Sequence, residues 1–211
     1  MPRKAAKAET PPLSLEKIDV PLEVIALPVG DPALLVAIGQ AFTQKKSSVN
    51  VQGAVTQGDR KYDVNLQVKK NDTFNYDLKG KIGTMDVSLH AEKPLLWPSI
   101  NVTGKIGANK VDLSNTLNLI TWNVSTEGKV GSVSLDLTSD TDKEKKKTIT
   151  RGKIGAMPFY NEVSAGTEVK QSHGTLGEVK IDGTGRETAP GHFVSHNVMG
   201  DVASSYQVEG Q

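Results

Sequence analysis

The sequence contains no cysteine, which excludes a disulfide framework, a thiolate zinc site and a cysteine nucleophile. Aromatic residues make up only 5% and hydrophobic residues only 36% of the chain, so much of the surface is expected to be wet. Neither sign of charge is in real excess, because 25 basic residues face 24 acidic ones, for a net charge of +1. This balance gives no general attraction to polyanions, and we expect no specific nucleic-acid partner.

The 211-residue chain also lacks a long apolar run. Its longest mostly apolar stretch, residues 20–38, is broken by prolines, a glycine and two acidic residues, which excludes a membrane-spanning helix there. The first twelve residues are basic and are followed by no apolar stretch of the signal-peptide type. We therefore expect cytoplasmic synthesis without a secretion signal, and no membrane partner.

The first 46 residues differ in character from the rest. Prolines at positions 11, 12, 21 and 28 forbid a helix interior, so residues 1–30 are predicted to form an extended arm. Asp31 can then cap a helix whose first turn accepts Pro32, and one helical face carries apolar residues. Those residues are Leu34, Leu35, Ile38 and Phe42. We predict one N-terminal helix over residues 31–46 and a separate β domain over residues 47–211.

The β domain is organised by an internal repeat. The motif Gly-Lys-(Ile/Val)-Gly begins at Gly80, Gly104, Gly128 and Gly152, four starts spaced 24 residues apart, and a degenerate copy begins at Gly174. A repeat of this length corresponds to one supersecondary unit, and the alternating polarity within it is typical of two strands. The sequence therefore predicts consecutive β-hairpins.

The two glycines of each unit have different predicted roles. The second begins a Gly-X pair between apolar residues, which is typical of a two-residue type II′ turn; the exception is a four-residue loop expected at 107–110, pairing Ile106 with Val111. The first glycine is then expected opposite a large apolar side chain, where a small residue leaves room. The expected pairs are Gly80 with Val87, Gly104 with Leu113, Gly128 with Leu135, Gly152 with Phe159, Gly174 with Ile181 and, in the preceding unit, Gly53 with Val64.

Following the alternation to the end of the chain gives about fourteen strands. The predicted fold class is an all-β antiparallel meander with one dry and one wet face. A sheet this wide cannot leave its apolar face uncovered, because open twisted sheets rarely exceed about ten strands. A closed barrel, a sandwich or a sheet covered by other copies would each satisfy this requirement.

The sequence carries no recognisable catalytic or metal-binding motif. It has no Gly-x-Ser-x-Gly elbow, no phosphate-binding loop and no His-Glu-x-x-His, and a strand would hold His192 and His196 about 13 Å apart. We expect no enzymatic activity, no cofactor and no metal.

Two segments are candidate partner contacts. Leu95, Leu96 and Trp97 lie between two prolines, and Leu119, Ile120 and Trp122 follow about one repeat later, at the same end of the neighbouring hairpin. These residues either form an interface or plug the core of their own chain. The basic residues Arg3, Lys4 and Lys7 belong either to a disordered tail or to a tether laid on a neighbour or a polyanion.

An arm, one helix and a repetitive one-faced sheet suit an architectural protein better than a catalyst. We expect a structural subunit of a large assembly, with a virion or phage tail-type particle as its context, whose partners are copies of itself and other subunits. A β-barrel membrane pore is the first alternative, since strands of about ten residues can span a bilayer. A carbohydrate-binding β module using Trp97 and Trp122 is the second.

Overall fold

The computed structural model describes residues 47–94, 98–165 and 169–210, and the regular structure of these residues is entirely β. The arm predicted at 1–30 and the helix predicted at 31–46 lie outside the described residues. The strands are β1 (Ser48–Gln57), β2 (Arg60–Lys70), β3 (Asn75–Ile82), β4 (Met85–Glu92), β5 (Ser99–Ile106), β6 (Asn109–Leu117), β7 (Val124–Val130), β8 (Val133–Asp142), β9 (Lys147–Ile154), β10 (Met157–Ala165), β11 (Val169–Leu176), β12 (Val179–Ala189), β13 (His192–Met199) and β14 (Val202–Gly210).

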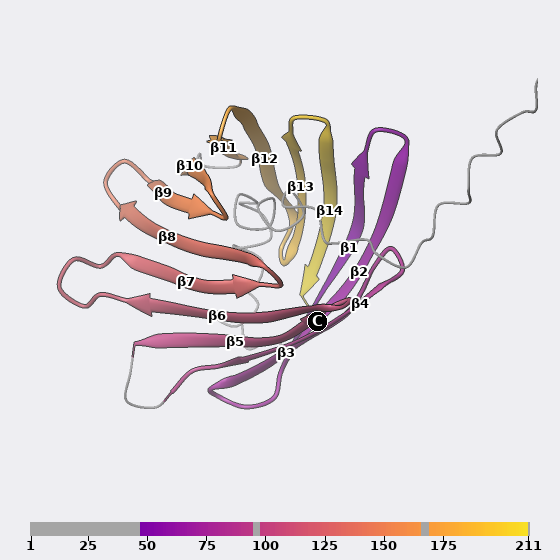
Figure 1. The fold of residues 1–211 in the computed structure, drawn as a ribbon, viewed down its shortest axis with the longest axis horizontal. Helices are drawn as coiled ribbons and strands as arrows, with labels where there is room; N and C mark the ends of the chain where they lie inside the picture. Colours follow the sequence, from indigo (N-terminus) through magenta and orange to yellow (C-terminus); the bar gives the residue numbers. More distant parts are fainter. Residues whose placement is uncertain (1–46, 95–97, 166–168, 211) are drawn as a thin grey trace, which may run out of the picture.

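The fourteen strands form one closed antiparallel barrel (Figure 1). Each strand pairs with its neighbours in sequence, and the barrel closes where β1 pairs with β14, seen in Figure 1 as indigo beside yellow. The closing pair is in continuous register from Val49–Gly210 to Gln57–Val202. The predicted all-β meander is confirmed, and of the three ways to cover its apolar face the chain uses closure, which leaves no sheet edge.

One end of the barrel is built from two-residue turns that begin with glycine. The connections at this glycine-turn end join β1–β2, β3–β4 and each later pair to β13–β14. The first residue of each turn is a glycine with φ between 54° and 60°, and the only described residues other than glycine with positive φ are Trp122 and Lys146. Positive φ at the first turn position alone is the type II′ pattern, so the predicted turns and the pairs Ile82–Met85 and Val130–Val133 are confirmed.

The exception predicted at Gly107 was wrong. Gly107 and Ala108 form the same two-residue turn as the other units, and Ile106 therefore pairs with Asn109. Gly104 consequently faces Val111 across the hairpin, while Leu113 pairs with Val102. The error shifts the pairing by two residues, which leaves the same side chains facing inward, so alternation of polarity could not reveal it.

The first glycine of each unit has a tighter environment than the sequence suggested. Gly128 does pair with Leu135, as predicted, but a Cβ on Gly128 would collide with the backbone carbonyl oxygen of Asp112 on the other side, on β6. Its φ of 138° is also one that residues with a side chain rarely adopt. The close approach of two backbones, more than room for the opposite side chain, therefore requires glycine here. Gly80, Gly104 and Gly152 share this conformation and this kind of contact.

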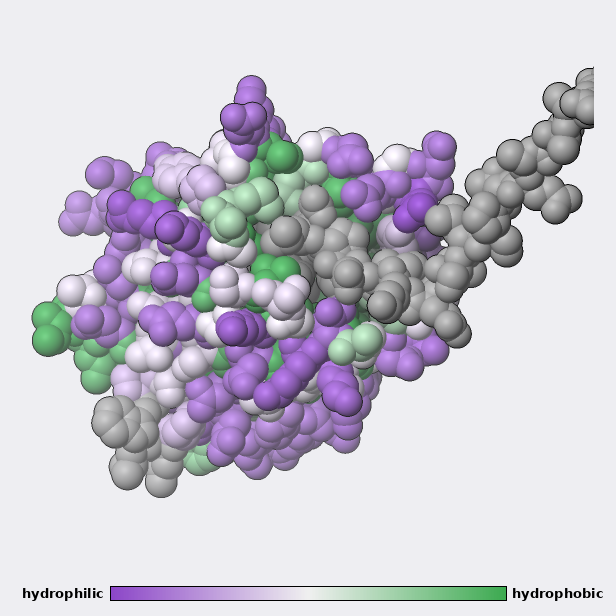
Figure 2. Space-filling view, in the orientation of Figure 1, coloured by the Kyte–Doolittle hydropathy of each residue, from purple (hydrophilic) through white to green (hydrophobic). Residues whose placement is uncertain are grey.

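The two faces of the sheet differ sharply in polarity. Outward positions carry mostly Lys, Asp, Glu, Ser, Thr and Asn, and the face seen in Figure 2 is correspondingly hydrophilic over most of its area. Inward positions form the core. Its best-buried members include Val49, Val51, Val55, Val111, Leu137, Ile154, Ile181, Met199, Val202 and Val208, each at most 1% exposed. No helix among the described residues is long and apolar enough to cross a membrane.

Candidate functional site

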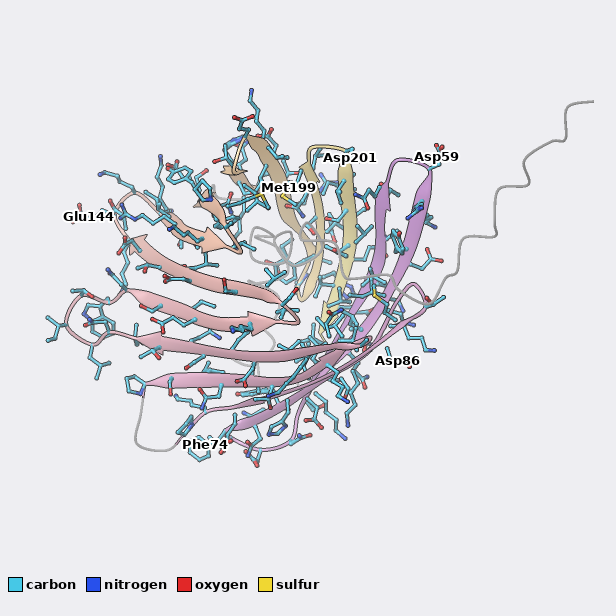
Figure 3. The ribbon with its side chains drawn as sticks, in the orientation of Figure 1. Asp59, Phe74, Asp86, Glu144, Met199 and Asp201 are labelled. Carbon is cyan, nitrogen blue, oxygen red and sulfur yellow. The ribbon has the colours of Figure 1, made fainter. Side chains whose placement is uncertain are left out.

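The first candidate site is the connection between β6 and β7, residues 118–123, which we call the tip loop. It lies at the end opposite the glycine turns, which we call the loop end. Figure 3 labels Asp59 and Asp201 in glycine turns and Phe74 and Glu144 in connections at the loop end. In Figure 2 the hydrophobic residues at the left edge coincide with the place of the tip loop in Figure 1.

The tip loop is an ordered, hydrogen-bonded turn. The Oδ1 atom of Asn118 accepts hydrogen bonds from the backbone N–H groups of Ile120 (2.9 Å) and Thr121 (3.1 Å). The Asn118 carbonyl accepts from the N–H of Trp122 (2.8 Å), and the Asn118 N–H donates to the carbonyl of Asn123 (2.8 Å). One asparagine therefore organises the whole turn, as is usual for Asn in Asx-type turns.

This turn holds three large apolar side chains in solvent. Leu119 is 61% exposed, Ile120 90% and Trp122 64%. The alternative that these residues plug the core of their own chain therefore does not hold for the tip loop. Trp122 also has a φ of 61°, a conformation that costs a bulky residue about 1–2 kcal/mol, and Lys143 Nζ lies 5.7 Å from its ring centroid. The exposed Trp122 side chain is therefore held on a strained backbone.

The other predicted contact residues cannot be placed in the same way. Leu95, Leu96 and Trp97 lie outside the described residues, as do Arg3, Lys4 and Lys7. The residue that follows Trp97, Pro98, accepts a hydrogen bond at its carbonyl from the N–H of Leu117 (2.7 Å). The end of the β4–β5 connection therefore lies against the base of the tip loop, as the repeat predicts for neighbouring hairpins.

The second candidate site was missed by sequence reasoning and lies inside the barrel. Ser172, Asn197 and Ser204, on β11, β13 and β14, are at most 4% exposed, and so is Asn161 on β10. We call these four side chains the polar inner wall. Within the described part of the chain no hydrogen-bond partner is found for Asn161 Oδ1, Ser172 Oγ, Ser204 Oγ or either polar atom of Asn197.

A glycine-lined recess brings these groups together. Gly183 on β12 pairs with Ser172 on one side and with Asn197 on the other, and Asn197 pairs with Ser204. A Cβ on Gly183 would collide with Asn197 Oδ1 and Ser172 Oγ, so these two polar side chains occupy the space that a side chain at position 183 would need. Neutral donors and acceptors thus lie together across the four adjacent strands β11–β14. Lys170, on the same face as Ser172, has a pKa lowered by burial.

The signal that could have revealed this wall is a break in the repeat. Leu89, Leu113 and Leu137 stand 24 residues apart, and each pairs with the first glycine of the next unit. The residue 24 positions after Leu137 is Asn161, which pairs with Gly174 in the same way. On β6–β9, several inward polar groups pair across strands. Thr126 Oγ1 donates to Asn115 Oδ1 (2.7 Å), for example.

Several charged groups on the outer face pair across strands. Lys147 Nζ lies 2.6 Å from Glu162 Oε1, which lowers the pKa of Glu162 and raises that of Lys147. Asp77 Oδ1 lies 2.8 Å from His90 Nδ1, and hydrogen bonds from His90 and then Asn71 lower the pKa of Asp77 to about 2. These exposed pairs are screened by solvent and organise no cleft.

One further hollow lies at the surface of the barrel. A hollow of about 330 Å³ lies near the loop end of β1, β13 and β14, with Asn50, His192 and Glu209 among its lining residues. Among the described residues no group of three or more His, Cys, Asp or Glu side chains could hold a metal ion. No protein-family model, curated protein or solved structure matches the chain.

Proposed function

We propose that this protein is a non-catalytic structural subunit of a larger assembly, of the kind that builds virions or phage tail-type particles, and that copies contact one another through the tip loop. The observation that carries this proposal is the exposure of Leu119, Ile120 and Trp122 on a fixed turn. Exposed apolar side chains held in one geometry are typical of an interface anchor, since little entropy is lost on docking.

The energetics support a specific contact of this kind. Burying a large apolar side chain from water stabilises by about 1.5–3 kcal/mol, so three such side chains supply several kcal/mol toward association. The surrounding outer surface is polar and contributes solubility instead. The basic residues Arg3, Lys4 and Lys7 would extend the contact by laying the arm on a neighbouring copy.

The outer surface also bears on the two alternatives. A barrel that spans a bilayer needs an outward apolar band, whereas the outward positions here carry charges such as Lys79, Glu127 and Arg151 along mid-strand. A sugar-stacking role would need an open face on Trp122, and the Lys143 ammonium, 5.7 Å from the ring centroid, competes for one of the two faces. Both observations favour a protein contact over lipid or carbohydrate binding.

The test compares the mass of the protein in solution with that of two variants. We expect Ile120→Asp to lower the oligomeric mass measured by light scattering at micromolar concentration, because a buried charge opposes docking. The matched control is Val179→Asp, which changes a 41% exposed valine beside a glycine turn at the opposite end and should leave the mass unchanged. A wild-type protein that is monomeric throughout, or equal masses for all three proteins, would contradict the proposal.

A further inference from the structure

The outer face of the barrel is almost uncharged at the place where the barrel closes. β1 and β13 contain no Asp, Glu, Lys or Arg, and β14 contains only Glu209, whereas every other strand contains at least one such residue. These three strands lie side by side, because β14 pairs with β13 on one side and with β1 on the other. We call their outer face the charge-poor seam. Depletion of charged residues is typical of the buried centre of a protein–protein interface.

The hollow of about 330 Å³ at the loop end lies on the charge-poor seam. Val194, Gln207 and Gln52 pair across β13, β14 and β1, so they form one row of its lining. Glu209 and Asn50 pair one row nearer the loop end and line it as well. A second hollow of about 270 Å³ meets the first at Val194, which lines both. The seam is therefore indented, and it offers an apolar side chain, neutral amides and one carboxylate.

The tip loop carries groups that complement this lining. The indole of Trp122 combines an apolar ring with one N–H donor, and a buried indole N–H needs an acceptor such as an amide oxygen. Lys143 Nζ lies 5.7 Å from the centroid of that ring, so a cation accompanies the indole. Glu209 offers the matching carboxylate, because its side chain is 55% exposed. Opposite charges that meet at an interface favour one partner in one orientation.

The tip loop and the hollow lie on opposite sides of the barrel. In the order of the strands, seven steps lead from β7 to β14 one way round and seven from β6 to β13 the other way. In Figure 1 the tip loop extends to the left, and β14 and β1 lie toward the right. Strands about 4.8 Å apart and tilted by about 40° separate the two sides by about 28 Å. Because the two patches face opposite directions, one pair of copies cannot form both contacts at once.

We propose that the hollow on the charge-poor seam of one copy receives the tip loop of the next copy, with Trp122 against Val194 and the amides and with Lys143 paired to Glu209. This inference rests on the proposed function, in which the tip loop is the contact, and adds the surface that receives it. The contact joins unlike patches, so each copy gives its tip loop to one neighbour and accepts that of another. Such a head-to-tail contact builds a ring or a filament, not a closed pair.

Mixing two defective variants tests this pairing in the full-length protein. Ile120→Asp disables the tip loop and keeps the hollow, whereas Gln207→Lys keeps the tip loop and places in the hollow a positive charge that repels Lys143. We expect each variant alone to have the light-scattering mass of one chain at micromolar concentration, and the equimolar mixture to reach the mass of two chains and no more. The control Thr103→Lys adds the same charge at an exposed outward position of β5 and should keep the wild-type mass.

The outcomes separate this proposal from the proposed function on which it rests. If Ile120→Asp loses the wild-type mass but Gln207→Lys keeps it, the tip loop is an interface with some other surface and the head-to-tail contact is wrong. A mixture that stays at the mass of one chain, or a wild-type protein that stops at two chains, would also overturn the head-to-tail contact. If Ile120→Asp keeps the wild-type mass, the role of the tip loop itself is wrong.

The absence of cysteine allows the contact to be trapped directly. Under a mild oxidant, an equimolar mixture of Ile120→Cys and Gln207→Cys should cross-link at least about tenfold faster than Ile120→Cys alone, since a disulfide needs Cα atoms within about 7 Å. Non-reducing gels measure the rate. The matched control mixes Ile120→Cys with Thr103→Cys, which moves the second thiol to β5 and should give no acceleration. Equal rates for the two mixtures, or a fastest reaction for Ile120→Cys alone, would contradict the contact between tip loop and hollow.

Discussion

The strands β1–β9 and the strands β10–β14 share one barrel but differ in what they turn inward. In the first group a leucine stands beside each repeat glycine, as Leu113 and Leu137 do, and inward polar groups such as Thr126 and Asn115 pair with one another. In the second group the equivalent position is Asn161, and the neighbouring strands add Ser172, Asn197 and Ser204. The outer faces of the two groups are alike in being polar. The barrel thus keeps its hairpin geometry while changing the chemistry of its lumen.

This difference shows which part of the repeat is structural. The glycine turns continue without interruption through β13–β14, where Gly200 has the same φ of 60° as the earlier turns. The pattern of inward side chains does not continue, because the position beside the repeat glycine is leucine up to β8 and asparagine, Asn161, on β10. Turn chemistry therefore specifies the fold, and the lining residues are free to vary with whatever the lumen contains.

The largest expected effect comes from exchanging residues between the two groups at the same repeat position. Leu137→Asn should cost about 4–5 kcal/mol of unfolding free energy, because it removes a fully buried apolar side chain and leaves an amide unpaired. The reverse exchange, Asn161→Leu, should change stability by no more than about 1 kcal/mol, since the Asn161 Oδ1 atom has no partner among the described residues. Denaturant unfolding measures both. Similar losses for the two variants would remove the distinction between the two groups of strands.

A somewhat smaller effect is expected at the repeat glycine itself. Gly128→Val should cost about 3–4 kcal/mol, because a side chain there meets the Asp112 carbonyl and the φ of 138° is unsuited to valine. The control Lys129→Val lies on the outward face one residue later and should cost less than about 0.5 kcal/mol. Equal denaturation midpoints for the two variants would contradict the close approach of β6 and β7 at Gly128.

Much of this fold could be predicted from the sequence because each turn is specified by residues that are adjacent in the chain. Gly-X pairs between apolar residues set the register of Ile82–Met85 and Val130–Val133 without reference to the rest of the chain. Closure could not be predicted in this way, since the β1–β14 pairing joins Gly53 to Tyr206 across almost the whole domain. The alternation of polarity is the same in a barrel and in a sandwich.

The two candidate sites also differ in whether they depend on local sequence or on pairing between distant strands. The tip loop could be identified from sequence, because Leu119, Ile120 and Trp122 stand together outside the strand alternation. Their exposure could not, since it depends on the turn that Asn118 organises. The polar inner wall was missed because its members are isolated polar residues on four separate strands, and only the register brings Ser172, Gly183 and Asn197 side by side.

The smallest expected effect concerns the outer face. The pKa of Asp77 should be about 2, because hydrogen bonds from His90 and then Asn71 stabilise its carboxylate. A carboxyl whose folded pKa is depressed contributes stability above its unfolded value, near 3.8, and loses it as the pH falls toward 2. His90→Ala should raise the pKa of Asp77 in a carboxyl NMR titration, and Lys79→Ala should raise it less, since the Lys79 hydrogen bond is the weaker contribution.

An Asp77 that titrates near 3.8 in the wild-type protein, or a larger shift for Lys79→Ala than for His90→Ala, would contradict the cross-strand pair between β3 and β4. Because the pair is exposed, the global unfolding midpoint at neutral pH should hardly move in either variant, in contrast with the inward substitutions at Leu137 and Gly128.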